Sequence, residues 1–334
     1  MKLNALVIGG GGFIGNHMVK RLKKEGYVVT ALDLKLPEYD ESAADRFIEG
    51  DARSESLLEG ILSIDGEPVF DEIYQFAADM GGAGYIFSGD NDANVMLNSA
   101  GINISLINSL VRASEHGNFK FPRVFYSSSA CIYPQELQVD AKRVDLSEEF
   151  AYPANPDSEY GWEKLFSERL YLSFERNYGC NVRVARFHNV YGPLGTFTGG
   201  REKAPAAVCR KVAEAPDNGE IEIWGSGEQT RSFLYIDDCI EAVRRFMVQD
   251  AFSGPMNIGS EEMVSIRELV RMVSKVAGKE ISVKSVPGPT GVAGRNSNND
   301  LVRRVLDWDY STSLEVGLEA TYSWIKMQMS DNSH

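Results

Sequence analysis

The strongest constraint on the fold is a run of four glycines, Gly9 to Gly12, which is followed by Phe13, Ile14 and Gly15. The run follows a short apolar segment that fits a buried strand and precedes an amphipathic segment that fits a helix. Glycines spaced G-x-x-G-x-x-G let the backbone turn, approach a pyrophosphate without a Cβ, and pack the helix close to the strand. The free N–H groups of the helix then face the phosphates. The sequence therefore predicts a dinucleotide site formed by Gly9, Gly12, Phe13, Ile14 and Gly15.

Strand-like and helix-like segments alternate over the first 190 residues. Further strands are expected at residues 27–34, 46–50, 71–78, 123–129 and 181–187, and two long helices at residues 92–116 and 158–178. This alternation predicts an α/β fold with a doubly wound parallel sheet of the Rossmann type. Shorter helices are expected at residues 203–215, 238–249, 265–277 and 312–328. They predict a smaller mixed α/β substrate-binding domain over the carboxyl edge of the sheet, where ligands of such folds bind.

The chain is long enough for two domains, because its 334 residues exceed the usual size of one. We expect the dinucleotide-binding domain to comprise residues 1–187 together with about 232–258. The substrate-binding domain is expected to comprise residues 188–231 and 259–334.

Charge and cysteine content narrow the class of partner. The formal net charge is −14, and such an acidic surface repels nucleic acid and anionic membranes. The four cysteines lie far apart and form no C-x-x-C pair, which argues against structural zinc and against a disulfide framework. We therefore expect a cytoplasmic protein with reduced thiols, without a bound metal and without a nucleic-acid or membrane partner.

Side chains at the ends of later strands complete the predicted cofactor site. Asp33 ends the second strand, where a carboxylate can accept both ribose hydroxyls of NAD and repel the 2′-phosphate of NADP. The third strand is followed by Asp51 and Ala52, which are expected near the adenine ring. The fourth is followed by Ala77 and Ala78, whose small side chains let a dinucleotide pass closely.

A serine, a tyrosine and a lysine make redox chemistry possible. Tyr160 and Lys164 are four residues apart and therefore share a helix face. A nearby ammonium and a nicotinamide cation would favour the phenolate, which could then act as a base. Ser129, at the end of the fifth strand, would hydrogen-bond the same substrate hydroxyl. The same spacing recurs at Tyr322 and Lys326 without a preceding serine strand, and there we expect packing only.

Taken together, the motifs GGGGFIG, FAAD, YSSSA, YGWEK and RFHNVYGP resemble the extended short-chain dehydrogenase/reductase superfamily over nearly the whole chain. This resemblance implies tightly held NAD and a nucleotide-sugar substrate. It also implies a homodimer joined through the helices near residues 92–116 and 158–178.

Two further residues narrow the expected chemistry. Cys131 lies two residues after Ser129, and a thiolate there could remove a carbon-bound proton if nearby cations lowered its pKa. Lys203 follows a flexible glycine pair and precedes a helix, which suits a side chain that reaches the pocket from the opposite side.

The segments AADMGGAG, SSACIYP, GGREKAPAA, WGSGEQTRSF and PGPTGVAGRNSNN are similar to those of the superfamily's epimerases of GDP-sugars. This resemblance implies that Cys131 and Lys203 form the acid/base pair, while Tyr160 and Lys164 serve a transient oxidation at C4 of the sugar. Lys211, Arg231 and Arg295 are then expected to contact the diphosphate and the guanine side. The implied substrate-binding residues are Gly81, Gly82, Ser129, Ala130, Cys131, Asn189, Glu202, Lys203, Ala204, Lys211, Gln229, Thr230, Arg231 and Arg295.

Two alternatives remain at this point. One is a 4-epimerase, dehydratase or decarboxylase of another nucleotide sugar, which would share Ser129, Tyr160 and Lys164. A dehydratase is expected to carry an Asp-Glu pair where this chain has Ala130 and Cys131. The other alternative is a non-catalytic NAD-binding scaffold on the same fold.

Overall fold

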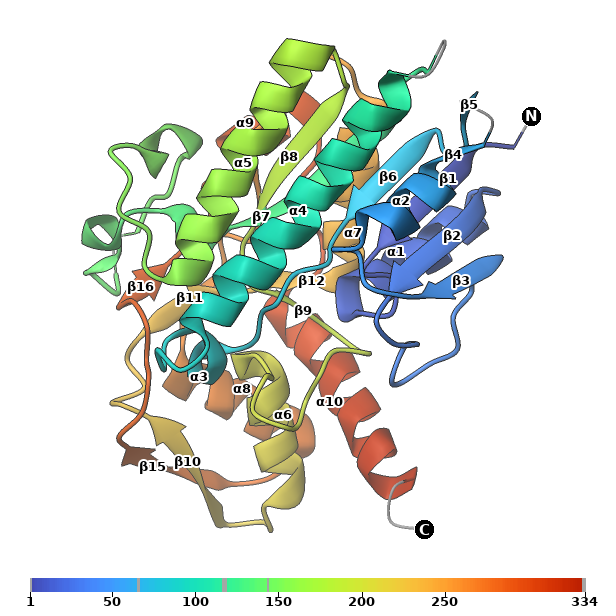
Figure 1. Cartoon of the computed structure of the whole chain (residues 1–334). Coiled ribbons are helices and arrows are strands. Elements are labelled where there is room, and N and C mark those ends of the chain that lie inside the picture. Colours follow the sequence, from blue (N-terminus) through green and yellow to red (C-terminus); the bar gives the residue numbers. More distant parts are fainter. Residues whose placement is uncertain (1, 65–66, 116–118, 143, 332–334) are drawn as a thin grey trace.

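A sheet of seven parallel strands forms the centre of the protein (Figure 1). The computed structural model describes residues 2–64, 67–115, 119–142 and 144–331. The strand order is β13-β8-β7-β6-β1-β2-β3, so the direction of winding reverses between β1 and β6. A ligand crevice is expected at such a reversal, beyond the carboxyl ends of the strands. The strands are β1 (Asn4–Ile8), β2 (Val28–Asp33), β3 (Arg46–Glu49), β6 (Glu72–Gln75), β7 (Arg123–Ser129), β8 (Val182–Phe187) and β13 (Met256–Ile258).

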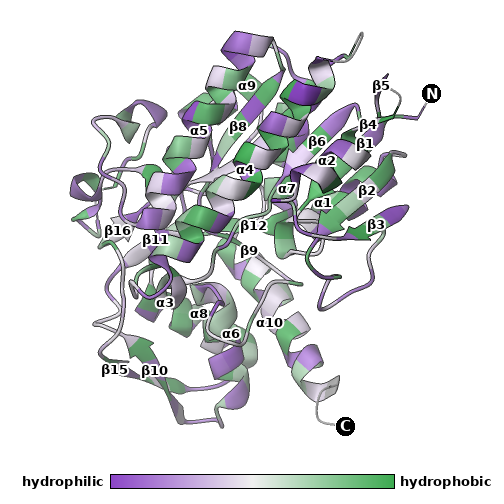
Figure 2. Cartoon of the chain, viewed as in Figure 1, coloured by the Kyte–Doolittle hydropathy of each residue, from purple (hydrophilic) through white to green (hydrophobic). Residues whose placement is uncertain are grey.

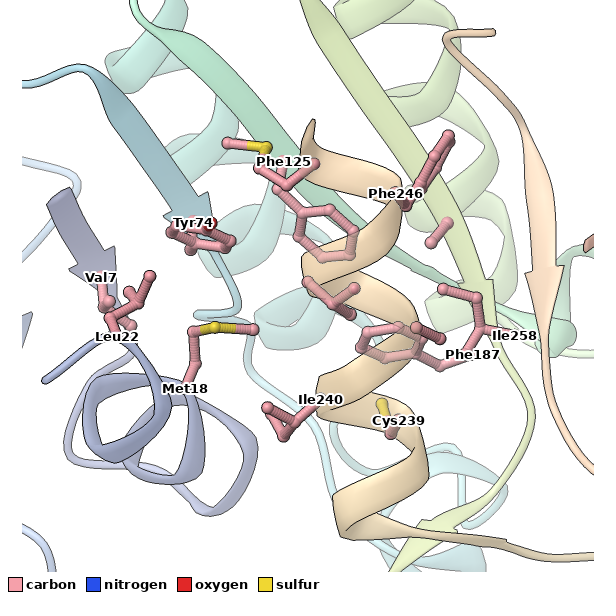
Figure 3. Close-up of a cluster of buried hydrophobic side chains, with 14 of the residues drawn as sticks. Val7, Met18, Leu22, Tyr74, Phe125, Phe187, Cys239, Ile240, Phe246 and Ile258 are labelled. Atoms are coloured by element: carbon pink, nitrogen blue, oxygen red, sulfur yellow. The ribbon is translucent and has the colours of Figure 1, made fainter. Parts of the chain in front are cut away.

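Helices cover both faces of this sheet because both faces of its central strands are apolar. On one face α1 and α7 pack together, and Figure 3 shows Met18 of α1 near Ile240 of α7 and Tyr74 of β6, with Leu22 of α1 beside Val7 of β1. On the other face Leu58, Leu106 and Tyr171 belong to a second core with the sheet. The helices are α1 (Phe13–Lys24), α7 (Ile236–Val248) and α9 (Asp300–Leu306) on the first face, and α2 (Glu55–Leu62), α4 (Asp92–Ser114) and α5 (Glu159–Tyr178) on the second.

A smaller layer lies beyond the carboxyl edge of the sheet, in the lower part of Figure 1. Its core contains apolar residues of α6 (Ala204–Glu214), α8 (Ile266–Ala277) and α10 (Leu314–Asp331), and of the paired strands β10 (Gly219–Trp224) and β15 (Ile281–Val286). The remaining short elements include α3 (Ala83–Ile86), β9 (Val190–Tyr191) paired with β12 (Leu234–Tyr235), β11 (Thr230–Ser232) between β14 (Met263–Ser265) and β16 (Gly294–Arg295), and the hairpin β4 (Ser63–Ile64) with β5 (Glu67–Pro68). Single 3-10 turns are η1 (Ala130–Ile132), η2 (Gln135–Gln138) and η3 (Glu148–Ala151).

The predicted α/β fold with a doubly wound parallel sheet is confirmed, and so are the long helices and the later short ones. The end of the helix predicted at residues 92–116 lies outside the described residues. The sequence did not reveal β13, a three-residue strand that pairs with β8 at the sheet edge. It also missed α2, α9 and the β10–β15 pair. None of the helices in the described residues combines the length and the apolar character that a membrane span requires.

The predicted division into two domains stays a prediction, although several contacts bear on it. The strand β13 joins the large sheet, and α7 packs against α1, as expected for residues 232–258. The helix α9 belongs to the segment predicted for the substrate domain, yet its Val302 and Leu306 lie in the core beside α1 and α7.

Candidate active site

The glycine loop between β1 and α1 packs so tightly that side chains would not fit. A Cβ on Gly15 would lie 2.0 Å from the carbonyl oxygen of Gly9, and a Cβ on Gly9 would lie 2.7 Å from the backbone nitrogen of Ala77. Gly9 also has a φ of +86°, which favours glycine. These contacts bring the N-terminus of α1 against β1 and the loop after β6.

The start of α1 is suited to an anion. Within the described part of the chain, the first turn of α1 has no acidic residue, and Gly12 provides no side-chain cap. The first N–H groups of a helix lack partners within the helix, so they can bind a phosphate here. The Oδ2 atom of Asp33 accepts a hydrogen bond from the Gly11 nitrogen at 2.9 Å, which places this carboxylate beside the loop. The residues present therefore fit a dinucleotide.

The other predicted cofactor residues lie at the same edge of the sheet. The carboxylate of Asp51 binds the guanidinium of Arg53, with Oδ2 2.6 Å from Nη2, and this pairing lowers the pKa of Asp51. Ala52 is buried next to it. The side chain of Gln75 brackets Ala77, since it accepts from the Ala77 nitrogen at 2.8 Å and donates to its carbonyl at 2.9 Å.

One cavity of about 360 Å³ connects this edge of the sheet with the smaller layer. It brings together most of the predicted site residues, from both halves of the chain. Thr230 does not line it, because its hydroxyl donates to the carbonyl of Ala141 at 2.6 Å. The predicted residues that line the cavity are Ile14, Ala78, Gly81, Gly82, Ser129, Ala130, Cys131, Tyr160, Lys164, Asn189, Glu202, Lys203, Ala204, Lys211, Gln229, Arg231 and Arg295.

Ser129, Tyr160 and Lys164 meet on one wall of the cavity. The helix α5 begins here because Ser158 caps it, its Oγ accepting from the Gly161 nitrogen at 3.2 Å. The Lys164 ammonium donates to the carbonyl oxygen of Ser127 at 3.0 Å and lies 5.6 Å from the centre of the Tyr160 ring. The three side chains thus occupy one small region.

Burial dominates the titration of this group. It raises the pKa of Tyr160, an effect that the Cys131 and Glu163 charges increase and a hydrogen bond with Ser129 opposes. Burial also lowers the pKa of Lys164. Burial therefore disfavours the Tyr160 phenolate, whereas the ammonium and the nicotinamide cation expected from the sequence would favour it.

Cys131 lies in η1, directly after β7, and faces the same cavity. Its backbone nitrogen donates to the Ser129 Oγ at 3.2 Å. The start of α5 approaches so closely that a Cβ on Gly161 would lie 2.2 Å from the Cys131 carbonyl oxygen. Burial raises the pKa of the Cys131 thiol and Asp157 raises it further, whereas Arg295 lowers it by donating to Sγ at 3.1 Å.

Lys203 enters the cavity from the smaller layer, at the first residue before α6. The carbonyl oxygen of the preceding Glu202 would lie 2.2 Å from a Cβ on Gly82, so this loop packs directly on the α3 region. Burial lowers the pKa of the Lys203 ammonium, and the charge of Cys131 opposes that shift. A thiol and an amine therefore share the cavity and interact through their charges.

Three basic side chains line the cavity in different ways. The Lys211 ammonium donates to the carbonyl of Glu222 at 2.6 Å. Arg231 donates to the carbonyl of Thr290 at 3.0 Å, and burial lowers its pKa to about 10. Arg295 is buried and contacts Cys131 directly, which was not expected for a residue predicted to contact the diphosphate.

Sequence reasoning missed several residues of the site. Trp224 and Phe87 line the cavity, and Asp157 and Gln138 hold Arg295. Asp157 is separated from Arg295 by 138 residues. Its position three residues before Tyr160 was the one available signal, and nothing in the sequence connects it to Arg295.

Known proteins resemble this chain in sequence and in fold. Residues 5–259 match the NAD dependent epimerase/dehydratase family. The GDP-mannose 3,5-epimerase of Arabidopsis thaliana is 44% identical over 98% of this chain and 83% of its own length. The GDP-mannose 3,5-epimerase 1 of Oryza sativa subsp. indica is 42% identical, with the same coverage of both chains. The crystal structure of UDP-glucose 4-epimerase from Thermotoga maritima shares the fold, with a TM-score of 0.82, 24% identity, and coverage of 98% and 100% of the two chains.

Proposed function

The chain belongs to the NAD-dependent epimerase/dehydratase family, and we propose that it is a GDP-mannose 3,5-epimerase. It would convert GDP-D-mannose to GDP-L-galactose, to GDP-L-gulose, or to both. The single observation that carries this proposal is that one cavity contains both a Ser129–Tyr160–Lys164 group and the pair Cys131 and Lys203. The relatives named GDP-mannose 3,5-epimerase support the choice of substrate, since they match 98% of the chain.

The redox half of the reaction uses the first group. Bound NAD supplies a reversible hydride acceptor at the carboxyl edge of the sheet. Tyr160 takes the proton of the C4 hydroxyl, while Ser129 hydrogen-bonds that oxygen and Lys164 stabilises the phenolate. When C4 is reduced again, Tyr160 would give the proton back to the C4 oxygen, so the net reaction would be an isomerisation.

The acid/base half uses the thiol and the amine. A ketone at C4 acidifies the C–H bonds at C3 and C5, because the negative charge left by the departing proton delocalises onto the ketone oxygen. The Cys131 thiolate removes that proton, and the Lys203 ammonium delivers one to the opposite face of the same carbon. After each inversion Cys131 is a thiol and Lys203 an amine, and proton exchange with solvent restores both. A 4-epimerase has no use for this second pair.

Substrate binding would involve residues from both layers. We place the sugar between η1 and the start of α6, beside Gly81, Gly82, Ala130, Asn189, Glu202 and Ala204. Lys211, Gln229 and Arg231 would bind the diphosphate and guanine side, where positive charge offsets the acidic surface. Thr230 would support this region through its neighbours rather than by contact.

The test is conversion of GDP-mannose in deuterated water, followed by NMR. Because different residues remove and deliver the proton, each inverted carbon should carry deuterium. We expect deuterium at C5, or at C3 and C5, together with new sugars. Absence of exchange with GDP-mannose, or conversion without deuterium at these carbons, would contradict the proposal. Exchange only with another nucleotide sugar would keep the chemistry and exclude GDP-mannose.

Substitutions of Cys131 and Lys203 test the acid/base role of each residue. Cys131→Ala should stop exchange but retain bound NAD, and Lys203→Ala should abolish inversion or alter its stereochemical outcome while GDP-mannose still binds. The control is Cys209→Ala, which removes another buried thiol that lies in the core of the smaller layer. It should exchange deuterium at the wild-type rate.

We also propose that the protein is a cytoplasmic homodimer joined through α4 and α5. The two helices lie side by side, and Figure 2 shows apolar residues on them. Leu97 is 70% exposed on α4, and Phe166 is 47% exposed on α5. All four cysteines are free, which supports a reducing compartment. Light scattering should give twice the chain mass, and Leu97→Asp should shift it toward the monomer.

A further inference from the structure

Asp157 lies behind Cys131, on the far side of Arg295. The guanidinium of Arg295 donates from Nη1 to the Cys131 sulfur at 3.1 Å, from Nε to Gln138 at 2.7 Å, and from Nη2 to the Asp157 carboxylate. We propose that Asp157 is a positioning residue that holds Arg295 against the sulfur of Cys131 and offsets part of its positive charge there. This inference rests on the proposed function, in which Cys131 is the base.

The geometry holds the three groups in fixed positions. The backbone nitrogen of Asp157 donates to the Cys131 carbonyl at 3.4 Å, so the two residues are also joined through the main chain. The Ser158 hydroxyl donates to the second carboxylate oxygen of Asp157 at 2.8 Å. The carboxylate can therefore hold the guanidinium in one orientation relative to the sulfur.

The ion pair is almost completely removed from water. The side chain of Asp157 is 2% exposed and that of Arg295 is 6% exposed. Charges in such an environment are screened much less than surface charges. A change of charge at Asp157 is therefore felt at the Cys131 sulfur through the guanidinium between them.

Among the charges that act on the Cys131 thiol, Asp157 is the anion and Arg295 the cation with the largest effect. The ionisable groups that interact with the thiol come from four different parts of the fold. They are Asp157 before α5, Tyr160 and Lys164 on α5, Lys203 before α6, Arg231 on β11 and Arg295 on β16.

This charge balance matters for a thiolate that must remove a carbon-bound proton. Several cations around a thiol make it a stronger acid, and its thiolate is then a weaker base. By offsetting Arg295, Asp157 keeps the thiolate basic while the guanidinium still orients the sulfur. Its carboxylate would thus act on the reaction without contacting the substrate.

The test compares Asp157→Asn with the wild type. Asparagine keeps an oxygen that accepts from Arg295 but removes the negative charge, so the guanidinium stays and its full charge acts on the thiol. The pH midpoint of Cys131 alkylation by iodoacetamide, measured by mass spectrometry of the modified peptide, should fall by about one unit, the lower end of the effect of a close charge. Below the midpoint, alkylation should be about tenfold faster at a given pH.

The opposite result would reveal a merely structural role. If Asp157 only supports the fold, the guanidinium should leave the sulfur in the variant, and the midpoint should rise. A raised or unchanged midpoint overturns the inference. Arg295→Gln provides a second test, because loss of the cation should raise the midpoint, and a fall there would also overturn it. Glu159→Gln removes an exposed carboxylate two residues away and should leave the midpoint unchanged.

Alkylation separates this inference from the proposed function, since it needs no substrate. The other three cysteines provide an internal reference, because all are buried and none lines the cavity. If the wild type fails to convert GDP-mannose but the Asp157→Asn midpoint falls, the proposed function is wrong and the coupling of Asp157 to the thiol stands. If GDP-mannose is converted and the midpoint does not fall, only the coupling is wrong.

Discussion

Gly161→Ala tests the contact between the start of α5 and Cys131. A Cβ at this position would lie 2.2 Å from the Cys131 carbonyl oxygen and 2.9 Å from the Pro156 side chain. Since such contacts are not tolerated below 3.0 Å, η1 and α5 must separate by about 0.8 Å. A misplacement of about 1 Å can reduce the rate about 100-fold. We therefore expect the turnover of GDP-mannose to fall about 100-fold while NAD stays bound.

A matched alanine substitution exists in the same chain. Gly60 lies inside α2, and apart from its chain neighbours and the backbone of its own helix, no atom of the described residues lies within 4 Å of a Cβ built there. Gly60→Ala should keep full activity and raise the free energy of unfolding by about 0.5–1 kcal/mol, because alanine favours helix. The assay is steady-state NMR of GDP-mannose conversion, with thermal unfolding of both variants. Wild-type turnover in a folded Gly161→Ala protein would refute the argument from close packing.

Three further predictions concern single side chains. Asp33→Asn should weaken NAD binding by about tenfold or more, because a charged acceptor is lost; fluorescence titration with unchanged affinity would contradict this. In the wild type, Arg186 Nη2 lies 2.9 Å from the Glu168 carboxylate, and Glu168→Gln leaves this buried guanidinium without its ion pair. The substitution should therefore lower the free energy of unfolding by about 3 kcal/mol. Denaturant unfolding measures the change, and a value near zero would contradict the prediction. Burial lowers the pKa of His188 from 6.5 to about 3. Between these two pH values the imidazole binds a proton in the unfolded chain but not in the folded one, so the free energy of unfolding falls as the pH drops below 6.5. The slope approaches about 1.4 kcal/mol per pH unit, and His188→Gln should flatten it.

Much of the fold follows from local patterns. The strand β7 is a β-branched and aromatic run that ends in serines, and α5 starts at a capping serine and ends at Gly179 in the left-handed conformation. Both signals lie within a few residues of the element. The strand β13 escaped prediction because three residues carry little periodicity, and its pairing with β8 depends on the edge that β8 exposes.

The site likewise contains residues that could be predicted from local patterns and contacts that could not. Residues at strand ends and at fixed helix spacing, such as Ser129, Tyr160 and Lys164, could be predicted because their position follows from their element. The contact of Arg295 with Cys131 and Asp157 joins residues more than 130 positions apart, and it depends on how β16 folds back onto the first layer. The dominance of burial in the titration of Tyr160 depends in turn on how completely the cavity wall is packed.

The most direct test of the account is a crystal structure with NAD and GDP-mannose bound. It should place the sulfur of Cys131 and the amine of Lys203 on opposite faces of the sugar ring, each about 3–3.5 Å from C5 or C3, as proton transfer requires. A structure in which either atom lies remote from those carbons, or in which both lie on the same face, would contradict the proposed chemistry.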